Sequence, residues 1–113
     1  MMYEKEKAAV LQTALAIKEN RLISLSGGNV SCQVVEDRYL VTPSGMLYER
    51  MVPEDICLID GQCRVIEGKR KPSSDSAALV YMFQNMKHVR AIIHTHQPWA
   101  TAAGVITDQL PEF

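Results

Sequence analysis

The sequence has few cysteines and no long hydrophobic run, and both absences limit its function. Its three cysteines, Cys32, Cys57 and Cys63, are odd in number and include no Cys-x-x-Cys pair. This argues against a disulfide framework and a thiolate zinc site, and it favours a reducing compartment. No run approaches the roughly 20 apolar residues of a membrane span, and the charged N-terminal segment lacks the apolar centre of a signal peptide. We therefore expect a cytoplasmic protein.

The chain also lacks an excess of charge of either sign. Twelve Lys and Arg residues balance 13 Asp and Glu residues, for a net charge of −1. No general attraction to nucleic acid or to an anionic membrane follows, and we expect neither as a partner. With 113 residues, 47% of them hydrophobic, the chain has the size and composition of one globular domain over residues 1–113.

The apolar pattern predicts helices at both ends of a group of strands. The first helix runs from residue 3 to about residue 20, with an apolar stripe formed by Leu11, Ala14, Leu15 and Leu22. The expected strands cover residues 30–34, 38–42, 56–59, 63–66 and 91–96. Hairpin turns are expected at Glu36-Asp37 and Asp60-Gly61.

A second helix is predicted from about Asp75 to Asn85, with Ser73 or Ser74 as its cap. Its apolar residues run nearly all round, so we expect it to be well buried. A third helix is expected from about Trp99. This order of elements predicts a sheet with helices packed against it.

Two histidines, His94 and His96, end the apolar run 91–96, which we interpret as a buried strand. Side chains at i and i+2 of a strand lie on one face, about 6.6 Å apart along the chain. Both imidazoles can therefore reach one metal ion. The alternative is one core histidine and one exposed histidine, because zinc needs three or four ligands. His88 lies about 20 Å from His94 if the chain is extended, so we expect it at the surface.

Three turns offer small residues and hydrogen-bond donors that suit an anion. They are Gly27-Gly28-Asn29, Pro43-Ser44-Gly45 and Pro72-Ser73-Ser74-Asp75, the last at a predicted helix N-terminus. Each alone is more often an ordinary turn or cap, but together they favour a phosphate site. Asp75 is either a carboxylate favoured by the helix dipole or a metal ligand and acid–base group beside the imidazoles.

Five motifs occur in an order that resembles the class II aldolase/adducin family. They are Gly28-Asn29-Val30-Ser31, Thr42-Pro43-Ser44-Gly45, Pro53-Glu54-Asp55, Lys71-Pro72-Ser73-Ser74-Asp75 and His94-Thr95-His96. The family includes fuculose-phosphate aldolases, ribulose-5-phosphate 4-epimerases and methylthioribulose-phosphate dehydratases. The resemblance runs from the first helix to Val105 and is specific to the family rather than to one member.

The resemblance implies an α/β fold of three layers, αβα, around a largely antiparallel or mixed sheet whose C-terminal part is missing. It implies a homotetramer and a zinc-dependent lyase that splits a small ketose phosphate by a retro-aldol reaction. The implied metal ligands for Zn²⁺ are His94, His96 and Asp75, and Asp75 is also the implied catalytic acid–base residue. The residues implied to hold the substrate phosphate are Asn29, Ser44, Gly45, Ser73 and Ser74.

The family signature is mixed between two activities. Asp75 matches the epimerases, since the aldolases usually have Glu there, whereas Thr42 matches the aldolases, since the epimerases commonly have Lys. A sugar-phosphate 4-epimerase is therefore the alternative activity. It would run the same retro-aldol step and re-add the aldehyde to the opposite face.

Two departures from the family pattern bear on activity. Leu79 stands where the family commonly has a histidine, and the family's third zinc-binding histidine lies beyond Phe113. Because a catalytic zinc site normally has three protein ligands, we expect weak metal binding and little turnover from these 113 residues. An inactive fragment or an adducin-like binding module stays open, although the retained His94 and His96 argue against the latter.

Overall fold

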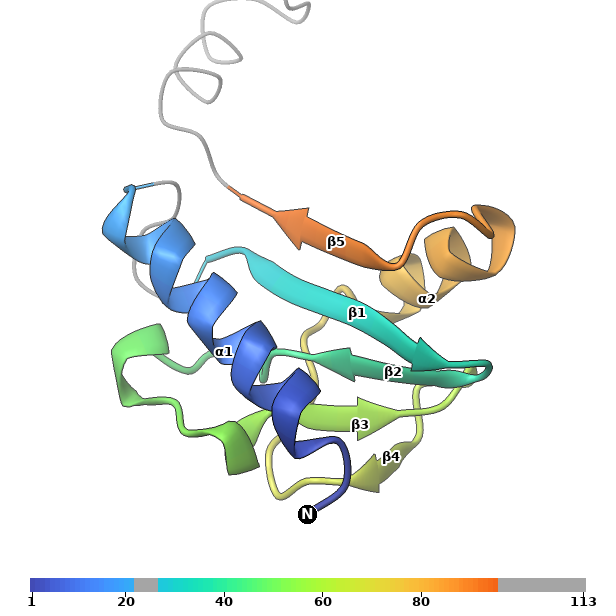
Figure 1. Cartoon of the computed structure of the whole chain (residues 1–113), viewed down its shortest axis with the longest axis horizontal. Coiled ribbons are helices and arrows are strands. Elements are labelled where there is room, and N and C mark those ends of the chain that lie inside the picture. Colours follow the sequence, from blue (N-terminus) through green and yellow to red (C-terminus); the bar gives the residue numbers. More distant parts are fainter. Residues whose placement is uncertain (22–26, 96–113) are drawn as a thin grey trace, which may run out of the picture.

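The computed structural model describes residues 1–21 and 27–95, and within them five strands form one sheet with a helix on each face (Figure 1). The helices are α1 (Glu4–Glu19) and α2 (Ser76–Asn85), and short 3₁₀ helices occur at Tyr48–Arg50 and Pro53–Asp55. The strands are β1 (Asn29–Val35), β2 (Arg38–Val41), β3 (Cys57–Ile59), β4 (Val65–Glu67) and β5 (Ala91–His94). Their order is β4-β3-β2-β1-β5, with every neighbouring pair antiparallel.

The structure describes most, but not all, of the predicted elements. The helix expected from Trp99, and the second histidine His96, lie outside the described residues. The strand predicted at residues 63–66 is found as β4, which begins at Val65. In the described part of the chain no helix is long and apolar enough to cross a membrane.

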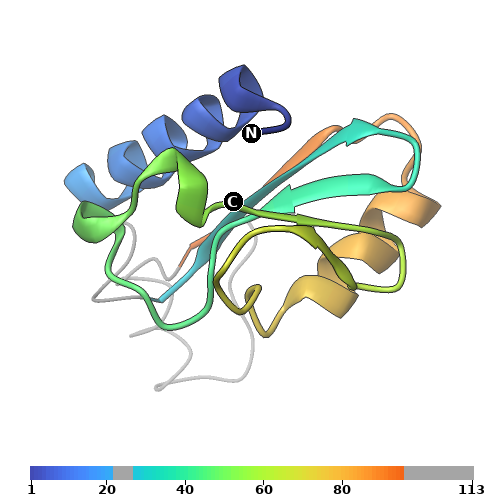
Figure 2. The ribbon, with the colours of Figure 1, turned by 90° about the horizontal axis from the view of Figure 1, so that it is seen from below.

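Alternating residues of the central strands build two hydrophobic cores, one on each face of the sheet. Leu40 of β2 and Leu58 of β3 pack with α1, whereas their neighbours Val41, Cys57 and Ile59 pack with α2. This alternation follows from the two-residue period of a strand. Figure 2 shows α1 above the sheet and α2 below it. The three-layer αβα arrangement around an antiparallel sheet is therefore confirmed.

Helix α1 is confirmed, but its fully buried face shares only Ala14 with the predicted stripe. The buried residues are Lys7, Val10, Ala14 and Ile17. Leu11 and Leu15 are only partly buried, and Leu22 is outside the described residues. Lys7 is not part of the predicted stripe, yet its ammonium pairs with Glu67 of β4 while its aliphatic stem is covered. A compensated charge can occupy a position that the apolar pattern assigns to a hydrophobic residue.

Helix α2 is buried on one face only, so the prediction of a well-buried helix is wrong. Leu79, Val80 and Phe83 are buried, whereas Tyr81 is 66% exposed. The helix lies on one face of the sheet, and no described element covers its outer side. Asp75 is its N-cap residue, and Ser73 accepts a hydrogen bond from the Asp75 N–H (3.2 Å) rather than capping the helix itself.

Strand β5 lies at the edge of the sheet, so the prediction of a buried strand is also wrong. It pairs with β1 alone among the described residues, and Ile93 is 51% exposed. The strand ends at His94. An aliphatic run is buried only when neighbours cover both its faces, and the sequence of the run does not state how many neighbours it has.

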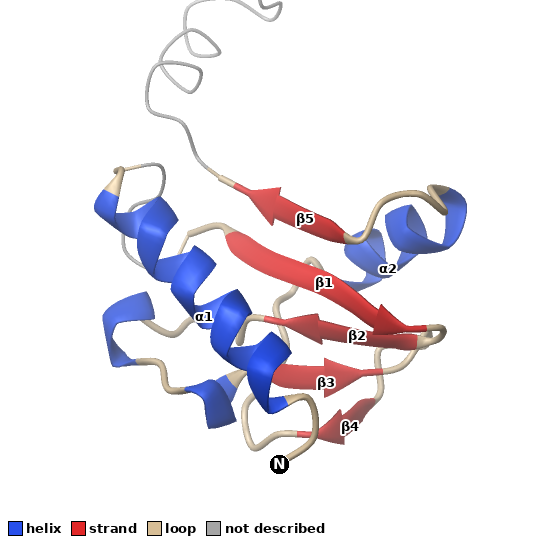
Figure 3. Ribbon diagram, in the orientation of Figure 1, coloured by secondary structure: helices blue, strands red, loops and turns tan. Residues whose placement is uncertain are grey.

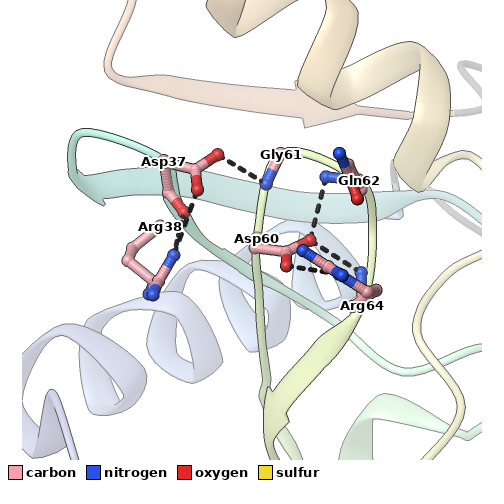
Figure 4. Close-up of polar contacts among 6 residues, drawn as sticks. All are labelled: Asp37, Arg38, Asp60, Gly61, Gln62 and Arg64. Carbon is pink, nitrogen blue, oxygen red and sulfur yellow. Dashed lines mark hydrogen bonds and ion pairs between the residues drawn. The ribbon is translucent and has the colours of Figure 1, made fainter.

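The two predicted hairpin turns meet at the end of the sheet opposite His94 (Figures 1 and 4). Asp37, which has a positive φ of 59°, accepts a hydrogen bond from the Gly61 N–H (2.8 Å) and so joins the two turns. The Asp60 carboxylate accepts bonds from the N–H groups of Gln62 and Arg64 and from the Arg64 side chain. The backbone N–H of Arg64 is the first cause of the lowered pKa of Asp60. These contacts stabilise one end of the sheet and leave the other end to the candidate site.

Candidate functional site

Three polar side chains from three elements meet where β1 begins and β5 ends. Asn29 is the first residue of β1 and lies opposite His94, the last residue of β5, in the antiparallel register. Asp75 reaches the same point from the N-terminus of α2. The Asn29 amide nitrogen donates to Asp75 Oδ2 at 2.9 Å, and the same oxygen is 3.1 Å from His94 Nδ1. The third side of this triangle, from Asn29 Nδ2 to His94 Nδ1, measures 3.3 Å.

The three residues differ sharply in exposure. Asn29 is 1% exposed, whereas the side chains of His94 and Asp75 are 46% and 48% exposed. The amide is therefore sealed inside the protein, while the imidazole and the carboxylate can meet a ligand. A buried amide holding an accessible carboxylate is an arrangement that orients the carboxylate before a substrate arrives.

The imidazole and carboxylate fit a zinc ion in chemistry and in spacing. Nitrogen and oxygen donors of these types are common zinc ligands, and two ligands of one tetrahedral zinc lie about 3.3 Å apart. The 3.1 Å between His94 Nδ1 and Asp75 Oδ2 is close to that separation. No group of three His, Cys, Asp or Glu side chains gathers within residues 1–21 and 27–95, and the predicted ligand His96 lies outside them. The structure thus brings together two of the three predicted ligands.

Leu79 is part of the hydrophobic core on the α2 side of the sheet. Leu79 is 3% exposed and packs in the α2-side core with Val41 and Phe83. One helical turn after Asp75, where the family commonly has a histidine, this chain therefore has Leu79 packed in the core.

A polar cavity of about 200 Å³ lies on one side of Asp75. Four of the five residues predicted to hold a phosphate line it, namely Ser44, Gly45, Ser73 and Ser74. Asn29, the fifth, is not among its lining residues and contacts it only through Asp75. Residues from all three donor-rich turns thus line one cavity.

Backbone hydrogen bonds hold the walls of this cavity. The Ser44 N–H donates to the Lys71 carbonyl (2.8 Å), which ties the turn after β2 to the loop before α2. The hydroxyls of Ser44 and Ser74 are exposed and have no protein partner in the part of the chain that is described. Gly45 has φ +69°, a conformation that favours glycine, and its Cα faces open space. The hydroxyls remain available as donors to an anion.

Thr42 supports the site in a way that the sequence did not indicate. It is 1% exposed, and its hydroxyl accepts a hydrogen bond from the Val30 N–H (3.2 Å). Its carbonyl accepts another from the Ser73 N–H (3.1 Å). Thr42 therefore joins β1, β2 and the serine loop. A threonine before Pro43 at the end of a strand was the only sequence signal for this role.

A second hollow, of about 360 Å³, lies on the other side of Asp75 and His94. Its remaining walls are apolar and come from α2 and β5, including Ala78, Met82 and Ile92. The carboxylate of Asp75 therefore stands between a polar cavity and an apolar hollow.

Comparison with known proteins identifies the family. A family model described as the class II aldolase and adducin N-terminal domain matches residues 8–113. The chain belongs to this family. A 5-deoxy-D-ribulose 1-phosphate aldolase from Bacillus thuringiensis is 30% identical over 112 residues, which cover 98% of this chain and 53% of that protein. An L-ribulose-5-phosphate 4-epimerase from Salmonella paratyphi B is 34% identical over 101 residues, covering 88% and 44%.

Solved structures of class II aldolases share the fold. An L-fuculose 1-phosphate aldolase superposes with a TM-score of 0.81 at 29% identity, covering 88% of this chain and 48% of the other. The L-fuculose-1-phosphate aldolase of Thermus thermophilus gives 0.73 at 27% identity, covering 92% and 53%. The resemblance seen in the five sequence motifs is confirmed at the level of the family. The chain spans about half the length of the relatives it matches.

Proposed function

We propose that this chain carries part of the active site of a zinc-dependent, aldolase-type lyase that acts on a small ketose phosphate. The observation that supports this most is the position of Asp75. Its carboxylate lies 3.1 Å from His94 and also lines the polar cavity formed by the serine turns. A substrate anchored by its phosphate in that cavity would have its carbon chain beside the carboxylate and the imidazole.

In this proposal the phosphate is held by the hydroxyls of Ser44, Ser73 and Ser74 and by the N–H groups of Gly45 and Ser74, which come from the turn after β2 and the turn before α2. His94, His96 and Asp75 hold the zinc ion. When bound, such an ion polarises a carbonyl oxygen and stabilises the negative charge that forms as a carbon–carbon bond breaks. Asp75 takes up a proton from the substrate and returns it, because its half-exposed carboxylate would lie beside the carbon chain of the substrate.

The Asp75→Asn variant tests the role of the carboxylate. The amide keeps the size of the side chain but cannot accept a proton, so we expect turnover to fall by about 10²–10⁴. The assay uses the protein expressed from its whole reading frame and loaded with zinc, and it follows release of dihydroxyacetone phosphate from ketose 1-phosphates. Glu54→Gln, which neutralises an exposed carboxylate, is the matched control. Undiminished turnover in the Asp75 variant would rule out the acid–base role.

A 4-epimerase is the second candidate, because Asp rather than Glu occupies position 75 and an epimerase is among the relatives. The two activities share a retro-aldol step but differ in products. An epimerase returns a ketose 5-phosphate with inverted configuration, whereas an aldolase releases an aldehyde and a separate three-carbon phosphate. Product analysis by NMR decides between them, and absence of both products from the zinc-loaded protein contradicts the proposed chemistry.

The phosphate site is tested by Ser73→Ala/Ser74→Ala. Wild-type protein should gain thermal stability when inorganic phosphate is added, because a ligand that binds only the folded state shifts unfolding by mass action. The double variant should lose most of this gain, with chloride at equal ionic strength as the control. An equal gain in both proteins would remove these serines from the site.

We also propose that the protein forms a homo-oligomer in the cytoplasm. Sedimentation of the same preparation tests the oligomeric state.

A further inference from the structure

The polar cavity beside Asp75 is lined by hydrogen-bond donors but by no cation of the described part of the chain. Its lining consists of glycine, proline and serine residues together with the Asp75 carboxylate. A phosphate ester carries about 1.5 to 2 negative charges at pH 7, so in this cavity it would meet neutral donors and one like charge. Like charges a few ångströms apart repel each other. A cation close to the cavity, but outside its lining, would offset this repulsion.

A basic run, Lys69-Arg70-Lys71, leads directly into the serine turn before α2. Contacts to other parts of the chain hold its last two residues in place. The Arg70 side chain pairs with Asp55 (3.0 Å), and the Lys71 carbonyl accepts a hydrogen bond from the Ser44 N–H (2.8 Å). The backbone of Lys71 is therefore fixed beside the turn after β2, whose residue Ser44 lines the cavity.

Lys71 is the cation of this run that is both near the cavity and unpaired. Arg70 is already paired with Asp55, and Lys69 lies two residues further from the serine turn. Lys71 is exposed and forms no ion pair with the residues that the structure describes. Paired backbones lie about 4.8 Å apart, and the four-carbon stem of a lysine is longer than that, so the Lys71 ammonium can reach an anion beside Ser44.

We propose that Lys71 supplies the positive charge that favours a doubly charged phosphate ester in the polar cavity. This inference rests on the proposed phosphate site. Lys71 acts through its charge rather than as a lining donor, since it is not among the lining residues. Salt screens such an interaction, because the screening length falls from about 30 Å at 0.01 M to about 3 Å at 1 M ionic strength. Lys71 is thus a specificity residue that strengthens substrate binding, rather than a catalytic residue.

The first test measures the affinity of the protein for inorganic phosphate. Lys71→Met keeps the length of the stem and removes the charge, and we expect the affinity to fall about threefold at low ionic strength, the scale of an exposed charge pair. Lys71→Arg should restore it, because the charge is kept. Lys69→Met is the matched control, since Lys69 is also exposed and unpaired among the described residues, and its affinity should equal that of wild type.

Ionic strength separates a charge effect from a structural one. The difference between wild type and Lys71→Met should disappear near 1 M sodium chloride. A loss that persists there would mean that the substitution changes the fold of the site, and this outcome overturns the proposal. Equal losses in Lys69→Met and Lys71→Met would show a general effect of the basic run, which overturns it as well.

The serine variant distinguishes failure of this inference from failure of the phosphate site. If Ser73→Ala/Ser74→Ala loses phosphate affinity while Lys71→Met keeps it, the site stands and the role of Lys71 is overturned. If wild-type protein binds no phosphate at either ionic strength, the phosphate site itself is contradicted, and the role of Lys71 with it.

Steady-state kinetics give a second readout of the same charge. Lys71→Met should raise KM for a ketose phosphate by about threefold and leave kcat unchanged, because the charge acts on the bound phosphate and on no later step. Added salt should narrow the difference in KM. A lower kcat with unchanged KM would place Lys71 in the bond-breaking step and overturn its assignment as a specificity residue.

Discussion

Strands β3 and β5 are both short and aliphatic, yet their surroundings are opposite. Cys57, Leu58 and Ile59 of β3 are at most 1% exposed, because β3 lies between β2 and β4 and is covered on both faces (Figure 3). In β5, Ile93 is 51% exposed, and β1 is its one neighbour within the described residues. Position in the sheet, rather than composition, determines which strand forms core.

The same difference explains where the candidate site lies. His94 ends the edge strand and is half-exposed, whereas Asn29, one strand further in, is sealed. A histidine in place of Ile59, the last residue of β3, would instead be buried, because that position is 1% exposed. The edge strand therefore carries an accessible imidazole, and the next strand carries a buried amide in contact with it.

The largest expected effect comes from shortening one side chain in each strand. Leu58→Ala removes buried methyl groups from the α1-side core and should lower the free energy of unfolding by about 2–5 kcal/mol. Ile93→Ala, at a half-exposed edge position, should cost under about 1 kcal/mol. Urea unfolding measures both. Equal losses would mean that β5 is covered in solution, which would break the contrast between the two strands.

A smaller effect concerns β4, the other edge strand. The Lys7 ammonium hydrogen-bonds to Glu67 and is the first cause that holds the pKa of this carboxyl below its ordinary value of 4.5. A carboxyl with a lowered folded-state pKa contributes stability above its unfolded pKa, and this contribution is lost as the pH falls through the lowered value. The melting temperature of wild type should therefore fall more steeply below pH 4.5 than that of Glu67→Gln.

Glu4→Gln is the control for this pH series, since Glu4 is an exposed carboxylate on α1, the helix that carries Lys7. Its profile should follow wild type throughout. Parallel profiles for wild type and Glu67→Gln would show that the pairing of β4 with α1 contributes nothing measurable, and both edges would then be equally loose.

The smallest effect distinguishes the two strands by thiol reactivity. Burial is the first cause that raises the pKa of Cys57 on β3, and likewise of Cys32 on β1, to about 11. Little thiolate exists in either case at neutral pH, so the rate of labelling depends on opening of the structure. Cys32 is partly exposed beside β5 and Cys57 is buried. In a Cys63→Ser background Cys32 should react first, as followed by mass spectrometry, and simultaneous labelling would contradict a looser edge.

Much of the fold was predictable because its signals are local. The helical period of residues 4–19, the turns at Glu36-Asp37 and Asp60-Gly61, and the serines before α2 each act within a few residues. The convergence of Ser44, Ser73 and Asp75 on one cavity was also expected from the motifs. The burial of Lys7 and the bracing role of Thr42 were not predictable, since both depend on partners far along the chain.

The sequence by itself determined the family, the kinds of element and their order, because periodicity, turn residues and motif spacing are properties of neighbouring residues. It also identified the candidate metal ligands, because the side chains able to bind a metal, such as an imidazole or a carboxylate, are known from the residue types alone. Only the tertiary structure decided that β5 is an edge, that α2 is covered on one face, and that the Asn29 amide meets Asp75 and His94. Those facts depend on which distant segments pack together, and burial and hydrogen bonding are properties of that packing.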